Sequence, residues 1–274
     1  MTDMTEWQGR VGRSWAEQWQ RTDRSFAPLT TRLIEAILSS GGGHSIVDIG
    51  CGAGELSIAL ANTKPDANIL GLDISVDLIA VATGRSIDKP NLNFAVADAA
   101  NWNDPADAPD IYVSRHGVMF FDDPVAAFTN LAHASAAKAK MVFSCFRSPA
   151  ENDWAREIAA LMPPAPAGDA HSPGPFAFAD PEYVRAILTK SGWKDVAFEP
   201  VDFDYVAGAG ADPVKDAMDF FSHIGPAARA IRSLDGSGQT DFLTRLRALA
   251  DAHVSAGAVR FAAAAWIVTA QKSA

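Results

Sequence analysis

The sequence predicts an α/β fold built around a doubly wound, mostly parallel sheet. From Ser45 onward, short apolar runs alternate with helix-like stretches, which is the pattern of consecutive strand–helix–strand units. The first run leads into a glycine-rich turn, VDIGCGAGE at 47–55, where a helix is expected to begin. A last apolar run at 259–270 is expected to close a seven-stranded sheet, as an antiparallel edge strand or as an inserted one.

The first half of the chain contains five expected strands, each short, apolar and bounded by turn residues. They span 45–49, 68–72, 92–96, 111–114 and 140–146. The helices between them are expected at about 54–62, 76–84 and 124–136. Asp123 can cap the last of these helices, and Pro124 suits its first turn because proline lacks the N–H that a first-turn residue leaves unbonded.

The second half of the chain contains two stretches that interrupt the alternation of strands and helices. A Pro/Gly-rich excursion at 148–180 predicts a substrate-side loop, and a helix at 181–191 and a strand at 195–205 follow it. The next stretch is helix-like throughout, with candidate helices at 214–224, 226–233 and 240–255. We therefore expect four parts: an N-terminal helical cap at 1–40, a core at 41–207, a helical lid insertion at 208–257 and a closing strand at 258–274.

Composition narrows the class of protein. With 48% hydrophobic and 20% charged residues, the 274-residue chain is expected to fold into a packed structure. The formal net charge of −10 argues against a nucleic-acid partner. Cys51 and Cys145 are too few for a disulfide framework, and no His/Cys spacing indicates a metal site.

The chain is expected to be cytoplasmic, with no integral membrane segment. Its N-terminus carries charges and tryptophans where a signal peptide needs an apolar stretch. The longest apolar runs, such as 261–268, fall short of the roughly 20 residues that span a bilayer. The oligomeric state stays open between monomer and homodimer.

The glycine-rich turn predicts a ligand site. The acidic Asp48 precedes it, and Gly50, Gly52 and Gly54 stand at alternate positions. Glycines let a ligand approach the exposed N–H groups at a helix N-terminus, which suits an anionic group such as a carboxylate.

Two more acidic residues follow at the ends of the next strands. Asp73, 19 positions after Gly54, can accept both hydroxyls of a ribose. Asp98 follows the third strand and can receive an adenine amino group, with Ile74 and Ala99 flanking the ring. Carboxyl ends of neighbouring parallel strands meet at one sheet edge, so the three carboxylates predict a nucleoside site.

The chain resembles the class I S-adenosylmethionine-dependent methyltransferases, and within them a bacterial group similar to the ubiquinone/menaquinone-biosynthesis type. Beyond the glycine turn, the resemblance includes the segments SRHGVMFFDDPVAAFTNL at 114–131, GPFAFADP at 174–181 and the closing AAWIVTA. It implies a Rossmann-like fold and S-adenosylmethionine as cofactor. The expected lid at 208–257 and the Pro/Gly-rich loop are apolar with interspersed Asp and His, which favours a small, partly apolar acceptor that is aromatic, quinone-like or a natural product.

The resemblance also assigns roles to residues. Asp48 and the Gly50–Gly54 loop, including Cys51, would hold the methionine portion; Asp73 would hold the ribose; and Asp98 with Ala99 would hold the adenine. Ser114 would lie beside the sulfonium. Trp15 either borders the cofactor pocket or, with Trp19 on the same helix face, packs against the domain.

Two departures from the family pattern stand out. The turn before the fifth strand reads AAKAK instead of Pro-Gly-Gly, and His116 stands where an aromatic residue is expected. Methyl transfer needs alignment above all, and a base where the acceptor must lose a proton. His116 is the first candidate for that base and His223 the second, although a lone histidine is more often a hydrogen-bonded neighbour.

Alternatives to this interpretation remain. Arg115 could bind a substrate carboxylate but is expected instead to pair with Asp122 or Asp123. A non-catalytic module that binds the cofactor would carry the same residues. An NAD-dependent oxidoreductase would share the turn, but the spacing here is GxGxG and no Tyr-x-x-x-Lys appears.

Overall fold

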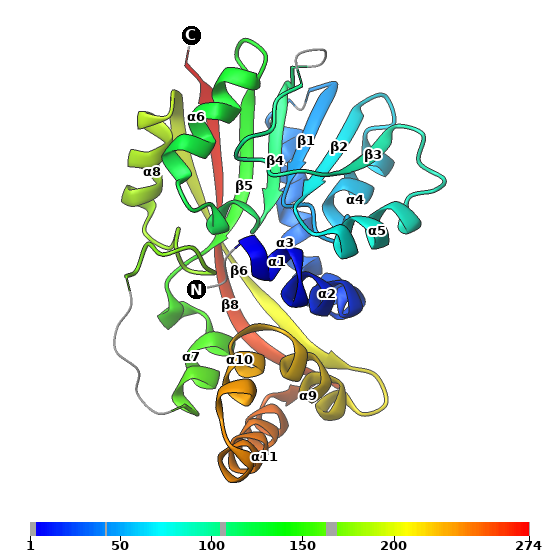
Figure 1. Ribbon diagram of the computed structural model, residues 1–274, viewed down its shortest axis with the longest axis vertical. Coiled ribbons are helices and arrows are strands. Elements are labelled where there is room, and N and C mark those ends of the chain that lie inside the picture. The colour runs from blue at the N-terminus through cyan, green and yellow to red at the C-terminus, as the bar shows by residue number, and fades with distance from the viewer. Residues whose placement is uncertain (1–3, 42, 105–107, 163–168, 274) are drawn as a thin grey trace.

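The computed structural model describes residues 4–41, 43–104, 108–162 and 169–273. Its centre is one sheet in the order β3-β2-β1-β4-β5-β8-β6 (Figure 1). In that order the strands are Leu92–Val96, Asn68–Asp73, Ser45–Ile49, Ile111–Arg115, Lys140–Phe146, Ala258–Lys272 and Trp193–Ala209.

The sheet is mixed only at its β8 end. The pairs β1–β2, β1–β4, β2–β3 and β4–β5 are parallel, whereas β8 runs antiparallel to both β5 and β6. The last strand is therefore inserted between two others, which decides between the two placements expected from the sequence. A two-residue strand, β7 at Val254–Ser255, pairs with β8 beyond the seven expected strands. The helix predicted to reach Ser255 ends at Ala252 instead, because the chain turns back there to form this hairpin.

Helices surround the sheet. The N-terminal helices are α1 (Met4–Gln8), α2 (Arg10–Glu17) and α3 (Trp19–Ser39). The core helices are α4 (Glu55–Thr63), α5 (Val76–Arg85), α6 (Pro124–Ala134) and α8 (Pro181–Lys190). The predicted cap of α6 is confirmed, because the Asp123 side chain accepts a hydrogen bond from the N–H of Ala126 at 3.0 Å and Pro124 occupies the first turn.

Two phenylalanines of β5 show that both faces of the sheet are covered. Phe143 and Phe146 are three positions apart, so they point to opposite faces. Phe143 packs against Phe128 of α6, with ring centroids 6.0 Å apart. Phe146 packs against Phe26 of α3, also at 6.0 Å. The expected doubly wound arrangement is confirmed.

The region predicted as a substrate-side loop contains a helix that the sequence analysis missed. Helix α7 spans Asp153–Ala160 and buries Trp154, Ala155 and Ile158. These residues lie at i, i+1 and i+4, so they share one face, but a stretch of only eight residues gives a weak periodic signal. Residues 163–168 of the predicted loop lie outside the described part of the chain.

Three helices lie between β6 and β8: α9 (Pro213–His223), α10 (Gly225–Ser233) and α11 (Gly236–Ala252). They gather at the lower end of the molecule in Figure 1, where α9 contacts both long strands and α10 contacts α7. No helix in the described ranges is long and apolar enough to cross a membrane.

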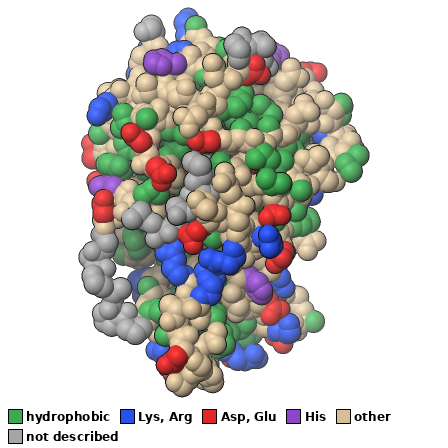
Figure 2. Space-filling view, in the orientation of Figure 1, with side chains coloured by type: hydrophobic (Ala, Val, Ile, Leu, Met, Phe, Trp, Pro, Cys, Tyr) green, Lys and Arg blue, Asp and Glu red, His purple; other side chains and the backbone are tan. Residues whose placement is uncertain are grey.

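The front of the sheet carries a shallow hollow. It has a volume of about 250 Å³ and is lined by residues that include Val47, Leu70 and Trp102. Figure 2 shows apolar side chains gathered on the upper front of the molecule. The hollow includes Ser45 and Asn68, the first residues of their strands, so it lies away from the carboxyl ends that carry the candidate site.

Candidate cofactor and acceptor site

The glycine loop after β1 adopts a conformation that favours glycine at each alternate position. Gly50, Gly52 and Gly54 have φ values of +63°, +55° and +84°. A Cβ on Gly50 would lie 2.8 Å from the Cα of Gly117, so the loops after β1 and β4 touch backbone to backbone. A Cβ on Gly52 would meet no atom within 4 Å, so this part of the loop faces open space.

Asp48 lies buried beneath the loop. The hydroxyl of Ser57 donates a hydrogen bond to its Oδ2 at 2.5 Å, whereas its buried Oδ1 has no protein partner. Burial raises the pKa of this carboxyl to about 7, against the lowering effects of Ser57 and Arg115. A buried carboxylate oxygen without a partner is suited to receiving a cationic or hydrogen-bond-donating group.

Asp73 joins the glycine loop to the end of β2. Its Oδ2 accepts a hydrogen bond from the N–H of Gly52 at 2.9 Å, and its Oδ1 accepts one from the N–H of Ser75 at 2.9 Å. Burial raises its pKa, although these hydrogen bonds oppose the effect. Ile74 is half-buried beside it. Cys51, within the loop, is buried and unpaired, and burial raises the pKa of its thiol.

Asp98 shapes the turn after β3. Its Oδ1 accepts a hydrogen bond from the N–H of Ala100 at 2.9 Å, and its Oδ2 accepts one from the Asn101 side chain at 2.6 Å. Ala99 is buried in the same turn. The structure thus puts both residues just beyond the carboxyl end of β3, and their contact with an adenine remains a prediction.

Ser114 connects the ends of β1 and β4. Its hydroxyl donates to the carbonyl of Ile49 at 2.6 Å and accepts from the N–H of Gly117 at 3.0 Å. Both interactions fix the two loops that meet at Gly50 and Gly117. The hydroxyl therefore has a structural role, because it holds the loops after β1 and β4 together.

His116 follows β4 in a left-handed conformation, with φ +65°. Its ring is buried and stacked on Phe146 at a centroid distance of 4.1 Å, and its Nδ1 lies 3.5 Å from the hydroxyl of Ser144. Burial, aided by the nearby Arg115, lowers its pKa to about 3. The ring is therefore neutral at pH 7 and a weak proton acceptor. His223, the second candidate base, is exposed, and its Nδ1 lies 2.7 Å from the carbonyl of Asp219.

Arg115 has other partners than the two aspartates expected from the sequence. Its guanidinium pairs with Glu55, lies 4.0 Å from Asp23 and donates to the hydroxyl of Thr30 at 2.8 Å. The expected pairing with Asp122 or Asp123 is wrong, because the side chain points under α3 and α4. No sequence pattern relates positions so far apart.

The N-terminal helices pack against the site. The ring of Trp15 contacts Trp7 at 5.7 Å, and Trp7 contacts Phe120, just beyond β4, at 5.2 Å. A Cβ on Gly12 would lie 2.2 Å from both the Ser75 hydroxyl and the Trp7 carbonyl, so α2 touches the start of α5. Trp7 and Gly12 are not among the site residues expected from the sequence. A glycine inside a helix was an available signal for Gly12, because it is costly unless close packing needs it.

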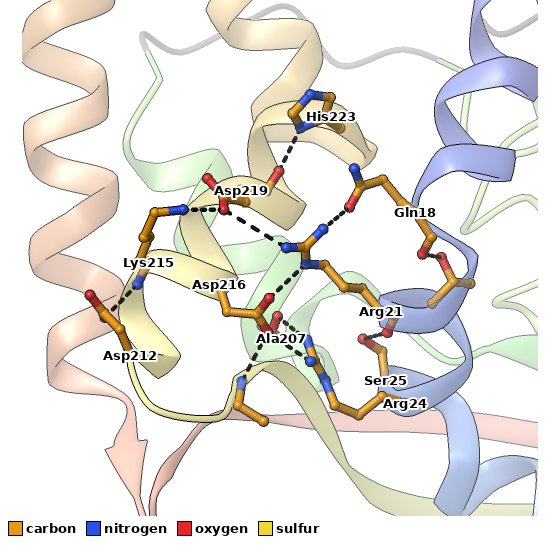
Figure 3. A network of polar contacts seen from close by, with 12 residues as sticks. Gln18, Arg21, Arg24, Ser25, Ala207, Asp212, Lys215, Asp216, Asp219 and His223 are labelled. Carbon is orange, nitrogen blue, oxygen red and sulfur yellow. Dashed lines mark hydrogen bonds and ion pairs between the residues drawn. The ribbon is translucent and has the colours of Figure 1, made fainter.

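The N-terminal helices also contact the α9–α11 insertion through ion pairs (Figure 3). Asp216 of α9 accepts from Arg21 at 2.7 Å and pairs with Arg24 at 2.7 Å. Arg24 also donates to the carbonyl of Ala207 at 2.9 Å, and the Asp216 carboxylate accepts from the N–H of Ala209 at 3.1 Å. Helix α3, the end of β6 and helix α9 are therefore held as one unit.

Comparisons with known proteins agree with this geometry. A family model described as "Methyltransferase domain" matches residues 46–138. The malonyl-[acyl-carrier protein] O-methyltransferase 1 of Ilyobacter polytropus is 30% identical over 120 residues, 44% of each chain. The trans-aconitate 2-methyltransferase of Methylobacterium radiotolerans is 38% identical over 77 residues, 28% of each chain. These matches span less than half the length of either relative.

A solved structure shows the same fold around the cofactor. It is the phosphoethanolamine N-methyltransferase 2 of Haemonchus contortus in complex with S-adenosyl-L-methionine, with a TM-score of 0.52 at 15% identity, covering 89% of this chain and 53% of that one. Together these matches support the class I S-adenosylmethionine-dependent methyltransferase family for the segment 46–138 of this chain. Two of the similar solved methyltransferases contain S-adenosyl-L-methionine or its product S-adenosylhomocysteine, which supports S-adenosylmethionine as the cofactor.

The site fits that cofactor on its own chemistry. The unpartnered Oδ1 of Asp48 and the open side of Gly52 leave an acceptor and space beside the loop. Each Asp73 oxygen uses one lone pair on a backbone N–H, so acceptor capacity remains for ribose hydroxyls. In the described part of the chain, no group of three or more His, Cys, Asp or Glu side chains could hold a metal ion.

Proposed function

We propose that the protein transfers a methyl group from S-adenosylmethionine to a small, partly apolar acceptor. One observation carries this proposal: Asp48, the left-handed glycine loop and Asp73 form one connected cluster at the carboxyl ends of β1 and β2. Asp48 and the loop would hold the methionine portion, Asp73 the ribose, and Asp98 with Ala99 the adenine. When bound, the cofactor supplies an activated methyl group on a sulfonium.

The chain's own contribution is alignment and exclusion of water. The ring cluster around Phe146 contains Phe26, His116, Trp154 and Phe176, and it supports an aromatic, quinone-like or natural-product acceptor. We propose that α1–α3 act as a cap and α9–α11 as a lid over this cluster, since their ion pairs tie them together. A base role for His116 remains a prediction, which its low pKa does not favour.

Cofactor binding and catalysis can be tested in sequence. Calorimetry with S-adenosylmethionine and S-adenosylhomocysteine should give heat for both, and NADH fluorescence should not change on mixing. Incubation with methyl-labelled cofactor and a mixed metabolite extract should then yield a labelled small molecule. Binding without any transfer would favour the non-catalytic module, and no binding of either molecule would refute the proposal.

We also propose that the protein is cytoplasmic and that its partner is a small molecule. The two cysteines are buried and unpaired, which fits the reducing cytoplasm. The acidic net charge of −10 supports a small molecule over a nucleic acid as partner.

A further inference from the structure

Two buried polar atoms in one aromatic cluster have no hydrogen-bond partner. They are Nε1 of Trp154 and Nε2 of His116. The side chains are 7% and 8% exposed, and both rings lie against Phe146, at centroid distances of 5.3 Å and 4.1 Å. Leaving a buried donor unsatisfied costs roughly 1–3 kcal/mol, so two such atoms around one ring need an explanation other than packing.

The indole of Trp154 is held firmly in place. It stacks on Tyr205 at 5.4 Å and on Phe176 at 5.9 Å, with interplanar angles of 21° and 22°. Asn152, at the start of α7, clamps the helix to β8 by donating to the carbonyl of Ala264 at 3.1 Å and accepting from its N–H at 3.0 Å. The direction of the indole N–H is therefore built into the fold.

Tyr205, on the other side of that stack, is fixed by the N-terminal helices. Arg24 donates to the carbonyl of Ala207 at 2.9 Å, as Figure 3 shows, and the hydroxyl of Ser25 lies 2.9 Å from the carbonyl oxygen of Val206. These bonds fix β6 immediately after Tyr205. Tyr205, the member of the aromatic stack that belongs to β6, is thus held in place through the backbone that follows it.

The imidazole of His116 offers a second donor beside the same Phe146 ring. The Ser144 hydroxyl lies 3.5 Å from Nδ1, and when it donates to that nitrogen the ring proton resides on Nε2. Burial lowers the pKa of His116 to about 3, so the ring presents one N–H and no net charge at neutral pH. Both unpartnered atoms can then donate a hydrogen bond.

We propose that Trp154 and His116 select the methyl acceptor by donating hydrogen bonds to its oxygen atoms. The inference rests on the proposed function and deepens it. The acceptor class is a flat aromatic or conjugated molecule that carries a carbonyl, phenolate or carboxylate oxygen. The rings of Phe146, Phe176 and Tyr205 contact its apolar body. Trp154 is a specificity-determining residue, and His116 acts as a hydrogen-bond donor.

The test uses two probes of equal size on the full chain saturated with S-adenosylhomocysteine. Acetophenone offers a carbonyl oxygen, and α-methylstyrene has a methylene carbon in its place. Ligand-observed NMR titration gives both dissociation constants. The wild type should bind acetophenone at least fivefold more tightly, as one or two buried hydrogen bonds imply. Trp154→Phe should reduce this ratio to twofold or less, and His116→Asn, which tolerates the left-handed backbone, should also reduce it.

Trp266→Phe is the matched control. Trp266 donates to the carbonyl of Ala179 at 3.2 Å, so its replacement should lower the thermal midpoint and leave the probe ratio unchanged. Trp154→Phe removes an unsatisfied donor together with part of a packed ring, so its integrity is checked by its binding of S-adenosylhomocysteine, which should match that of the wild type. A wild type without preference for acetophenone, or a Trp154→Phe variant that retains it, overturns the inference.

The control on the cofactor keeps the two proposals apart. Failure of the wild type to bind S-adenosylhomocysteine refutes the proposed function. Normal binding of S-adenosylhomocysteine together with equal or absent binding of the two probes refutes only the selection by Trp154 and His116.

Discussion

The backbone N–H of Gly52 donates a hydrogen bond to Oδ2 of Asp73 at 2.9 Å, across the carboxyl ends of two neighbouring parallel strands. The bond places the second acidic residue against the loop that follows the first. A change at Asp73 therefore removes a proposed ribose contact and loosens the glycine loop as well.

Asp73→Ala should weaken binding of S-adenosylhomocysteine by at least tenfold, because it removes acceptors for two hydroxyls and one bond that orders the loop. Isothermal titration calorimetry measures the change. Asp66→Ala, in an exposed turn of the same βα unit, is the control and should bind as the wild type does. Unchanged affinity in Asp73→Ala would exclude Asp73 from the cofactor site.

Asp48→Asn should alter the pH dependence of stability. The raised pKa, about 7 against the ordinary 3.8, means that the folded state retains this proton longer than the unfolded chain. Wild-type stability should thus fall as pH rises from about 4 to about 7 and then level off, by on the order of 4 kcal/mol from this group. Asn carries no charge, so this part of the pH dependence should disappear.

Urea unfolding of both proteins between pH 5 and pH 8 tests the sign. Asp48→Asn should gain stability relative to the wild type as pH rises, while its affinity for S-adenosylmethionine falls. A stability difference that is constant over this range would show that Asp48 titrates well below it.

Gly12→Ala should destabilise the contact between α2 and α5. The new Cβ would lie 2.2 Å from the Ser75 hydroxyl and from the Trp7 carbonyl, so backbone must move at a cost of roughly 1–3 kcal/mol. Limited proteolysis should then cleave the N-terminal helices faster. Gly84→Ala is the matched control, because its Cβ meets nothing within 4 Å in helix α5 and should stabilise by roughly 0.5–1 kcal/mol. Equal effects of both changes would contradict the close packing.

Asp216→Asn should loosen the α9–α11 insertion. Although desolvation opposes it, hydrogen bonds from Arg21 and Ala209 and the charge of Arg24 lower the pKa of Asp216. This group stabilises the fold at neutral pH, and its contribution is lost only as pH falls through the lowered pKa. Replacement should cost about 1–2 kcal/mol at pH 7, less in high salt because the groups are partly exposed.

Chemical denaturation at low and high salt measures this effect. Asp219→Asn is the control, since its carboxylate is 3.8 Å from Arg21 and its side chain is 42% exposed. It should cost less than about 0.5 kcal/mol. If Asp219→Asn lost more stability than Asp216→Asn, Asp219 and not Asp216 would be the residue that anchors the insertion.

The expected elements agree closely with the structure wherever the signal is local. The strands β1, β3 and β5 have the predicted bounds, because alternating apolar runs and flanking turn residues lie next to each other in the chain. Helix α7 was missed, since eight residues between Pro/Gly-rich stretches give little periodicity. The two-residue strand β7 was missed because it is held in an extended conformation only by its pairing with β8.

In the candidate site too, the sequence places some residues and leaves the contacts of others undetermined. Asp48, Asp73 and Asp98 could be placed from the sequence, because each ends or follows a predicted strand and parallel strands end at one edge. The partners of Arg115 could not, since Asp23, Thr30 and Glu55 come from two other helices. The pKa of His116 could not either, because desolvation depends on every segment that packs around the ring.

By itself the sequence determined the fold class, the row of acidic strand ends and the resemblance to a methyltransferase family, because hydrophobic periodicity and glycine turns depend on neighbouring residues. The tertiary structure alone decided that β8 is inserted between β5 and β6 and that Trp154 meets His116 around Phe146. Such contacts join residues far apart in the chain. Their energies come from packing and lost solvation, which exist only once the segments are folded together.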